Sequence, residues 1–438
     1  ERAIPLARSL GRNDGRPAAA SARSGPVVAY ASDHRPFLAA QVRDYGVYLS
    51  QVSGPGAGSE ARLRPRQAPA GDQLPTHPRE AEQVRRLRDY RIRLAGQTFR
   101  IARGDLHRHT DISADGIGDG SLTDLYRYAL DAAALDFIAV TDHGAGNDQE
   151  YSWWRTQKSC DLFFVPGAFT PLYGYERSIP YPNGHRNIVF DHRGLRTLPS
   201  SPEERQGKEG AARLYRYLKE NDGIAFAHTI ATDQGTDWRD NDPAVEPLVE
   251  IYQGFRNSYE HEGAPKSATA DRPYLFKSGY RPLGFYWNAL AKGYKLGVQA
   301  SSDHLSTHLS YACLYTTGLS RRELVEAMRA RRTYAASDNI LLDYRLVEAK
   351  GAEHLMGSSV VTAAAPLLKI HAVGTAPIHR VDIIRNGRYV YTAEPGQVQA
   401  QITFRDTQAA PGEAYYYVRV LQYDGQIAWS SPIWVIRK

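Results

Sequence analysis

Cysteine and long hydrophobic runs are scarce in this sequence, and each scarcity excludes a class of protein. The 438 residues include only two cysteines, Cys160 and Cys313, which excludes a disulfide framework and a cysteine-based metal site. We expect both thiols to be buried as small apolar groups. No uninterrupted apolar run is long enough to cross a bilayer, so the sequence predicts no membrane span.

Neither sign of charge dominates. The chain has 54 Lys and Arg against 48 Asp and Glu, a formal net charge of +6, which favours anionic partners in general. It has no lysine-rich tract and no basic stripe with interleaved aromatics, so there is no specific nucleic-acid signal. The first residue is Glu1 rather than Met, which favours a periplasmic or secreted protein over a cytoplasmic one.

The local patterns divide the chain into three regions. Residues 1–99 are predicted to form an irregular arm, irregular over 1–25, with a short β-hairpin within 26–53 and a charged helix over 80–93. From 100 to 338, strand-like and helix-like segments alternate, which is typical of an α/β sheet. From 339 to 438, short alternating runs and the turn signals Asn386-Gly387 and Asp424-Gly425 predict an antiparallel β-sandwich.

A histidine pair opens the α/β region. His107 and His109 directly follow the strand-like run 98–102. Residues two apart on a strand project from the same face, so both imidazoles can reach one point. Asp115 can return to that point from the next turn. Imidazole and carboxylate are suitable ligands for Zn, Fe and Mn.

Other histidines and carboxylates follow further predicted strands of the same region. They are His143, Glu176, His185, His228, Asp303 and His304. Active sites of α/β proteins are built where strands end. Five strands that deliver such side chains to one edge indicate a polynuclear metal site.

These motifs resemble the polymerase and histidinol phosphatase (PHP) family of metal-dependent phosphoesterases. The first motif is Asp105-Leu106-His107-Arg108-His109-Thr110 with Asp115-Gly116, and the later ones are Thr141-Asp142-His143, His228 and Ser302-Asp303-His304. The strings 250–256 and 300–304 resemble the DUF3604 branch of that family. The resemblance implies a distorted (β/α)7 barrel that holds two or three divalent ions (Zn, Mn or Fe).

The resemblance also implies a ligand set. The first ion would be bound by His107, His109, Glu176 and Asp303; the second by Glu176, His185 and His228; the third by Asp115, His143 and a histidine of the last motif. That motif departs from the family spacing, because Leu305 stands where the family places its histidine. His304 is the favoured ligand, and His308 is its competitor.

The implied activity is that of a hydrolase in which a metal-bridging hydroxide cleaves a phosphate mono- or diester of a small anionic molecule. His304, Asp115 and His308 are candidates to handle the proton of the leaving group. Arg177, Arg186 and Arg256 are candidates to bind the phosphate. A hydrolase of carboxylic esters, lactones or sulfate esters is the alternative, and a non-catalytic metal-stabilised module is a third hypothesis.

Overall fold

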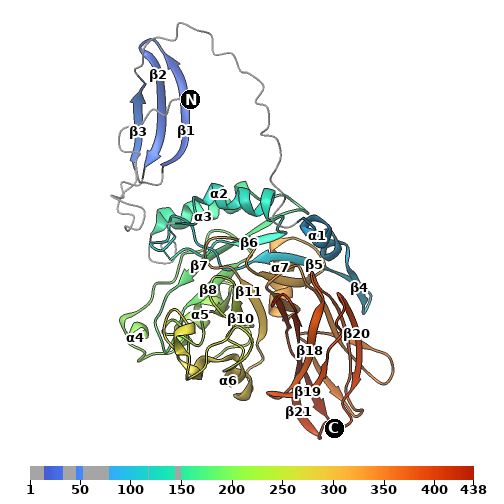
Figure 1. Cartoon of the computed structure of the whole chain (residues 1–438). Helices are drawn as coiled ribbons and strands as arrows, with labels where there is room; N and C mark the ends of the chain where they lie inside the picture. The colour runs from blue at the N-terminus through green and yellow to red at the C-terminus, as the bar shows by residue number, and fades with distance from the viewer. Residues whose placement is uncertain (1–13, 33–45, 53–77, 117, 144–148) are drawn as a thin grey trace.

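The computed structural model describes residues 14–32, 46–52, 78–116, 118–143 and 149–438. Near the N-terminus, three antiparallel strands form a small sheet in the order β1 (Asp14–Ala22), β2 (Gly25–Ser32) and β3 (Gly46–Gln51) (Figure 1). The prediction of an irregular chain over residues 1–25 is therefore wrong for β1, which is Ala-rich and lacks the alternating pattern by which strands are recognised. Its backbone pairs with β2 across a tight turn.

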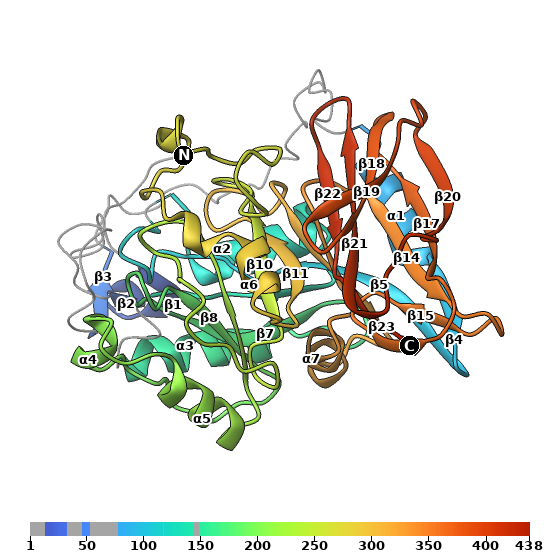
Figure 2. The ribbon, with the colours of Figure 1, turned by 90° about the horizontal axis from the view of Figure 1, so that it is seen from below.

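The α/β region follows a charged helix, α1 (Glu80–Asp89), and a short strand, β4 (Arg91–Leu94). Its sheet places seven strands in sequence order: β5 (Gln97–Asp105), β6 (Phe137–Ala139), β7 (Thr170–Arg177), β8 (Arg186–Phe190), β9 (Ile224–Ala227), β10 (Leu248–Gln253) and β11 (Gly297–Ser301). The helices between and after them are α2 (Leu122–Arg127), α3 (Glu150–Leu162), α4 (Pro202–Arg205), α5 (Ala212–Glu220), α6 (Tyr286–Ala291) and α7 (Arg321–Arg329). Figure 2 shows α3, α5 and α7 on the outside of the strands.

This sheet curls so that its first and last strands meet only beyond their carboxyl ends. Along most of its length, β5 pairs instead with the antiparallel strand β12 (Tyr311–Thr316). Among the described residues, backbone pairing with the β11 side is limited to the isolated bridge between Arg108 and Asp303, where Asp303 N donates to His107 O at 2.9 Å. Ser302, directly after β11, also donates to the side chain of Asp105 at the end of β5. Strand β8 is antiparallel to both of its neighbours. The α/β class is as predicted, but the distorted (β/α)7 barrel is not confirmed.

The C-terminal region is β-rich, as predicted. One sheet has the order β15 (Glu353–Leu355), β14 (Leu341–Val347), β17 (Leu367–Val373) and β20 (Gln399–Arg405). The other contains β13 (Thr333–Ala336), β16 (Ser359–Thr362), β18 (Ile378–Arg385), β19 (Arg388–Ala393), β21 (Gly412–Gln422), β22 (Ile427–Ser430) and β23 (Ile433–Arg437). Buried side chains of both sheets, among them Ile370 and Val418, belong to one apolar cluster, so the sheets pack face to face.

The two predicted hairpin turns are confirmed. Asn386 and Gly387 join β18 to β19 with positive φ angles of 49° and 70°, the conformation that Asn-Gly favours in tight hairpins. Gly425, at φ 82°, lies between β21 and β22. Because β22 pairs with β13 and β13 with β12, the backbone ladder continues across residue 338, and the boundary placed there stays a prediction.

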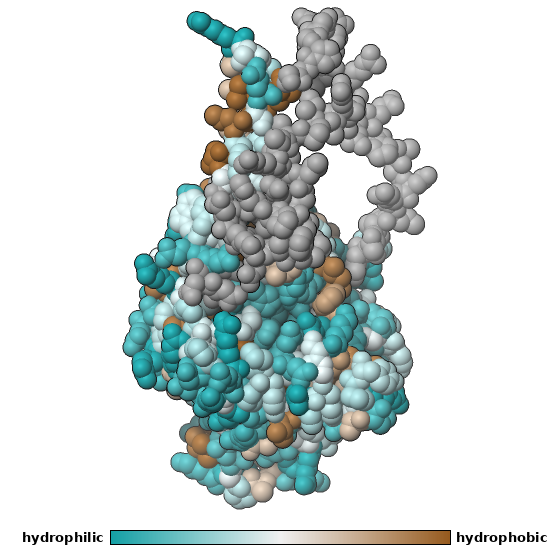
Figure 3. Space-filling model, turned by 90° about the vertical axis from the view of Figure 1, so that its left-hand side faces the viewer, coloured by the Kyte–Doolittle hydropathy of each residue, from teal (hydrophilic) through white to brown (hydrophobic). Residues whose placement is uncertain are grey.

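Both cysteines are buried and free, as expected, and burial raises the pKa of each thiol to about 12. Across the described residues, no helix is long and apolar enough to cross a membrane. Hydrophilic side chains predominate on the face shown in Figure 3, with hydrophobic ones scattered between them.

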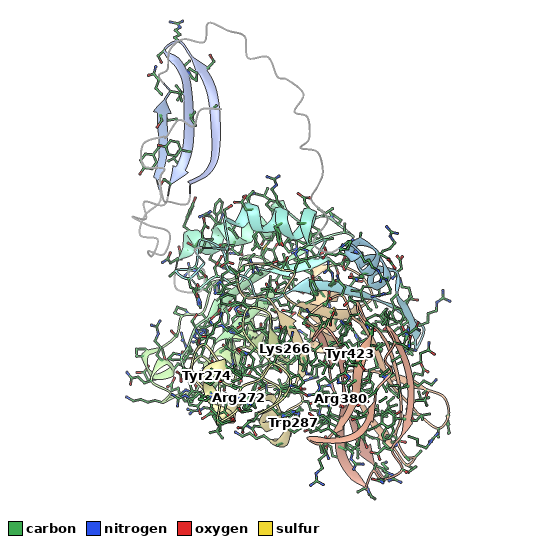
Figure 4. The ribbon with its side chains drawn as sticks, viewed as in Figure 1. Lys266, Arg272, Tyr274, Trp287, Arg380 and Tyr423 are labelled. Atoms are coloured by element: carbon green, nitrogen blue, oxygen red, sulfur yellow. The ribbon has the colours of Figure 1, made fainter. Side chains whose placement is uncertain are left out.

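A buried ionic cluster joins the C-terminal region to the segment between β10 and β11. Glu260 of that segment accepts hydrogen bonds from Arg419 Nη1 at 2.8 Å, Tyr417 Oη at 2.6 Å and Trp429 Nε1 at 2.8 Å. Arg419 also donates to Asp382 at 2.9 Å. In Figure 4, Lys266 and Trp287 of this part of the chain lie beside Arg380 and Tyr423 of the C-terminal strands.

We expect Arg419→Met to lower the free energy of unfolding by about 3–5 kcal/mol, because it leaves the buried carboxylates of Glu260 and Asp382 without their shared cation. Urea denaturation followed by circular dichroism measures this loss. The double variant Arg419→Met, Glu260→Gln should recover part of the stability, and the exposed Arg322→Met should leave it nearly unchanged. Equal losses in Arg419→Met and Arg322→Met would contradict the assignment.

Candidate metal centre

The predicted ligands reach one hollow because the strands that carry them end at the same edge of the curled sheet. His107 and His109 follow β5, His143 follows β6, and Glu176 is the penultimate residue of β7. His185 precedes β8, and because β8 is antiparallel, the start of β8 lies at the edge where its neighbours end. The hollow is lined by His107, His109, Asp115, His143, Glu176, His185, His228, Asp303 and His304, together with Thr229, Gln234 and Arg256.

The first predicted position has the size of a tetrahedral metal site. His107 Nε2 and His109 Nε2 are 3.2 Å apart. Each lies 3.3–3.4 Å from Glu176 Oε2 and 3.0–3.2 Å from Asp303 Oδ1. Ligands at about 2.0 Å from a tetrahedral ion are separated by about 3.3 Å. These four side chains therefore fit an ion at their centre.

Glu176 also faces a second group of imidazoles with its other oxygen. Oε1 lies 2.5 Å from His185 Nδ1 and 3.4 Å from both His228 Nε2 and His143 Nδ1. One carboxylate thus lies between the two groups, as a bridging ligand would. Within the described residues, Glu176 Oε2 and His228 Nε2 are buried and make no hydrogen bond. A cation in this space would give both atoms a partner.

The third predicted position lies at the open side of the hollow. Asp115 Oδ2 is 3.1 Å from His143 Nε2 and 3.8 Å from His304 Nε2, and the Asp115 side chain is 48% exposed. His308 does not reach this place. Its Nδ1 lies 2.6 Å from Tyr128 Oη and its Nε2 lies 3.0 Å from Glu80. Of the two competing histidines, the geometry supports only His304.

Polar groups behind three of the histidines hold the ring with Nε2 toward the hollow. His107 Nδ1 lies 3.0 Å from Glu250 Oε2, His109 Nδ1 lies 2.9 Å from Ser113 Oγ, and His304 Nδ1 lies 2.7 Å from Asp119 Oδ2. Such partners fix the tautomer and the orientation of a ligating imidazole. The sequence reasoning missed Glu250 and Asp119. For Glu250 there was a signal, a carboxylate in the middle of the apolar strand β10.

The backbone is strained where two ligands leave their strands. Asp303 and Leu305 have φ angles of 70° and 68°, and Thr229, next to His228, has 46°. Residues other than glycine rarely adopt this region, and they persist there when the surrounding structure demands it. Here the left-handed turn brings Asp303 and His304 into the hollow one after the other.

The electrostatics of the hollow favour a cation. Burial disfavours charge on His107, yet Glu250 and Asp303 outweigh it and raise its pKa to about 10. The surrounding histidines lower the pKa of Glu176 and Asp303 well below the usual range despite their burial. Burial, reinforced by His107, lowers the pKa of His228 to about 3, which keeps that imidazole free to coordinate. The donor set and its charge therefore fit divalent ions of the Zn, Mn or Fe type.

Two of the three predicted substrate arginines lie outside the hollow. Arg177 donates to Glu204 at 2.6 Å and Arg186 donates to Glu246 at 2.8 Å, and both side chains are buried. Consecutive strand residues point to opposite faces, so neighbours of the ligands Glu176 and His185 must point away from the site. Their assignment to substrate is corrected accordingly. Arg256 does line the hollow, with Nε 3.4 Å from Asp303 Oδ2.

The fold and site define an α/β protein with a buried cluster of His, Glu and Asp side chains. The family model described as "Protein of unknown function (DUF3604)" matches residues 146–262. This match, with the motifs named above, confirms the prediction that the chain is DUF3604-like.

Similarity to relatives extends over most of the chain. An uncharacterized protein of Chlamydia pneumoniae is 27% identical over 345 residues, covering 70% of this chain and 53% of the relative. One from Chlamydia trachomatis serovar D is 27% identical over 358 residues, covering 72% and 55%. The chain thus spans about half the length of these relatives.

Among solved structures, a two-domain protein from Bacteroides vulgatus contains a predicted PHP-like metal-dependent phosphoesterase. It is 14% identical to this chain, and the match covers 76% of this chain and 95% of that protein with a TM-score of 0.39.

Metal binding should release protons. Without metal, His107 is protonated at neutral pH because its pKa is raised to about 10, and coordination requires the neutral imidazole. We expect Zn²⁺ uptake at pH 7 to release about one to two protons, and the affinity to rise with pH between 6 and 8. Calorimetric titration in two buffers of different ionisation enthalpy measures this release. An affinity that does not change with pH would contradict the ligand assignment.

Glu250 can be tested apart from the ligands. Glu250→Gln keeps the shape of the side chain but weakens its hold on His107 Nδ1, and we expect the metal affinity to fall about 10- to 100-fold. Competition with a chromogenic chelator measures the change. The exposed Glu220→Gln provides the matched control, and unchanged affinity in Glu250→Gln would remove Glu250 from the metal centre.

Proposed function

We propose that this chain is a metal-dependent hydrolase that cleaves a phosphate mono- or diester of a small organic molecule. One observation carries the proposal: Glu176 contacts imidazoles on both of its oxygens, within a hollow where all nine predicted ligands meet. A structural metal site closes its ligand shell with protein side chains, whereas a catalytic site keeps one side open. Here the side of Asp115 is open.

Divalent ions bound in this hollow would supply Lewis acidity and a nucleophilic water at neutral pH. The residues of the chain hold and orient the other participants. Arg256 lies at the wall of the hollow, where its Nε is 3.4 Å from Asp303 Oδ2 and makes no hydrogen bond within the described residues, and a guanidinium presents paired donors that match phosphate oxygens. This supports a phosphate ester as the substrate.

The proton for the leaving group is assigned to His304 rather than to Asp115. Burial works against ionisation of Asp115, but its hydrogen bond with His143 and the nearby charge of His109 hold its pKa below the usual range, so it is a carboxylate that accepts rather than donates. His304 Nε2 faces the hollow, and Asp119 Oδ2 lies 2.7 Å from its Nδ1. In a site that holds only the first two ions, His304 Nε2 is not a ligand and can carry a proton to the leaving group.

A panel of p-nitrophenyl esters tests the reaction class. Metal-loaded protein should hydrolyse p-nitrophenyl phosphate or its bis-ester faster than the acetate or the sulfate. A preference for acetate or sulfate would favour the alternative, a hydrolase of non-phosphate esters. Failure with all of them would favour a non-catalytic metal-stabilised module.

His109→Ala and Asp303→Ala should each lower kcat/KM by at least about 10²-fold, because each removes a ligand of the first position. Initial rates with the best ester measure the loss, and circular dichroism checks the fold. The exposed His192→Ala should retain the wild-type rate. Full activity in both ligand variants would overturn the metal assignment.

A further inference from the structure

The hollow itself is too small to hold an organic substrate. The space that the centre of a water molecule can occupy among its side chains is only about 10 Å³, so the ligands leave room for ions and water but not for an organic group. The organic part of any ester must therefore lie outside the ligands, against the residues at the opening. What these residues offer determines which leaving groups are accepted.

One side of the opening is a fixed rim formed by the residues that follow β10. Gly254 N donates to Ser301 O at 2.8 Å and Phe255 N donates to Ser302 O at 3.2 Å. These bonds attach the rim to the residues that lead into Asp303 and His304. The Phe255 ring meets the His304 ring edge to face, with centroids 5.3 Å apart. Phe255 is therefore an apolar wall beside the ligand at the open side.

A second cation lies on this wall. Lys277 Nζ is 3.9 Å from the centroid of the Phe255 ring, and the side chain is exposed. Within the part of the chain that the structure describes, no carboxylate forms an ion pair with Lys277. The nearby acidic residue Asp233 is neutralised by Arg281 at 2.6 Å. The ammonium group of Lys277 is thus available to an anion at the rim.

Lys277 and Arg256 are held together. Arg256 Nη1 donates to Ser278 Oγ at 2.5 Å, and Ser278 is the residue after Lys277. Ser278 O in turn accepts from Asp233 N at 2.7 Å. Hydrogen bonds at Ser278 therefore fix both cations within residues 254–278, which we call the braced segment. Arg256 lies at the wall of the hollow, and Lys277 lies over the Phe255 ring.

We infer that Phe255 and Lys277 form a second subsite, and that the substrate carries a second anionic group, a carboxylate or another phosphate, joined to the reacting ester by a short organic spacer. The spacer packs on Phe255, and the second anion pairs with Lys277. This inference rests on the proposed function, because it assumes that a phosphate group binds at the ligands. It adds that substrates with one anionic group lack a contact that the rim provides.

Binding of two phosphonates to the metal-loaded protein tests the subsite without relying on turnover. Methylphosphonate has one anionic group, and 3-phosphonopropionate adds a carboxylate on a two-carbon spacer. We expect the wild-type protein to bind 3-phosphonopropionate at least about fivefold more tightly. Lys277→Gln should bring the ratio of the two affinities close to one, and Lys277→Arg should preserve it. Calorimetry measures both constants, with the exposed Lys350→Gln as the matched control.

The outcomes separate this inference from the proposed function. If methylphosphonate binds but the carboxylate adds no affinity, or if Lys277→Gln leaves the ratio unchanged, the subsite is overturned and the hydrolase proposal stands. If neither phosphonate binds to protein that holds its metal, both the subsite and the phosphate-ester substrate are overturned. A selective loss in Lys277→Gln supports the subsite.

Discussion

The structure of the site depends on one buried carboxylate. Glu176 lies between two groups of imidazoles, with Oε2 toward His107 and His109 and Oε1 toward His143, His185 and His228. The lone pairs of these carboxylate oxygens and imidazole nitrogens repel one another unless protons or metal ions lie between them. The fold holds them together all the same, through hydrogen bonds behind the rings and through strained turns such as that at Asp303. Cations that bind between these atoms would remove this repulsion and stabilise the arrangement.

The incomplete closure of the sheet is what brings these groups to one place. Because β12 occupies the edge of β5, the backbone after β11 pairs with the β5 side only past Asp105, at the bridge between Arg108 and Asp303. That bridge places His107, His109 and Asp303 within contact distance. The reversed direction of β8 has a similar effect, since it brings His185 to the edge where Glu176 lies. The departures from a regular barrel are therefore part of how the site is assembled.

The sequence predicted those features of the site that depend on local sequence patterns. Histidines and carboxylates near the ends of apolar strands were identified by position, the family resemblance implied the set of nine ligands, and all nine line the hollow. The arginines were less predictable, because a guanidinium finds its partner through tertiary contacts: Arg177 pairs with Glu204 and Arg186 with Glu246. The alternation of strand faces could have excluded both. Strand β1 was not recognised because its Ala-rich sequence lacks alternation, and the direction of β8 follows from its pairing with β7 and β9.

The segment after β10 links the two regions of the molecule in one physical chain of contacts. Its first residues, Phe255 and Arg256, border the hollow, and four residues later Glu260 is buried among Arg419, Tyr417 and Trp429 of the C-terminal strands. A rim that belongs to an isolated loop would lose conformational entropy each time it closed on a ligand. Here Arg419 and its neighbours have already fixed the segment, so the rim is organised before a ligand arrives. In the proposed enzyme, the ligands of the hollow would supply the chemistry and the residues after β10 would select the substrate. This gives the C-terminal strands a role at the opening although they contribute no residue to the metal cluster.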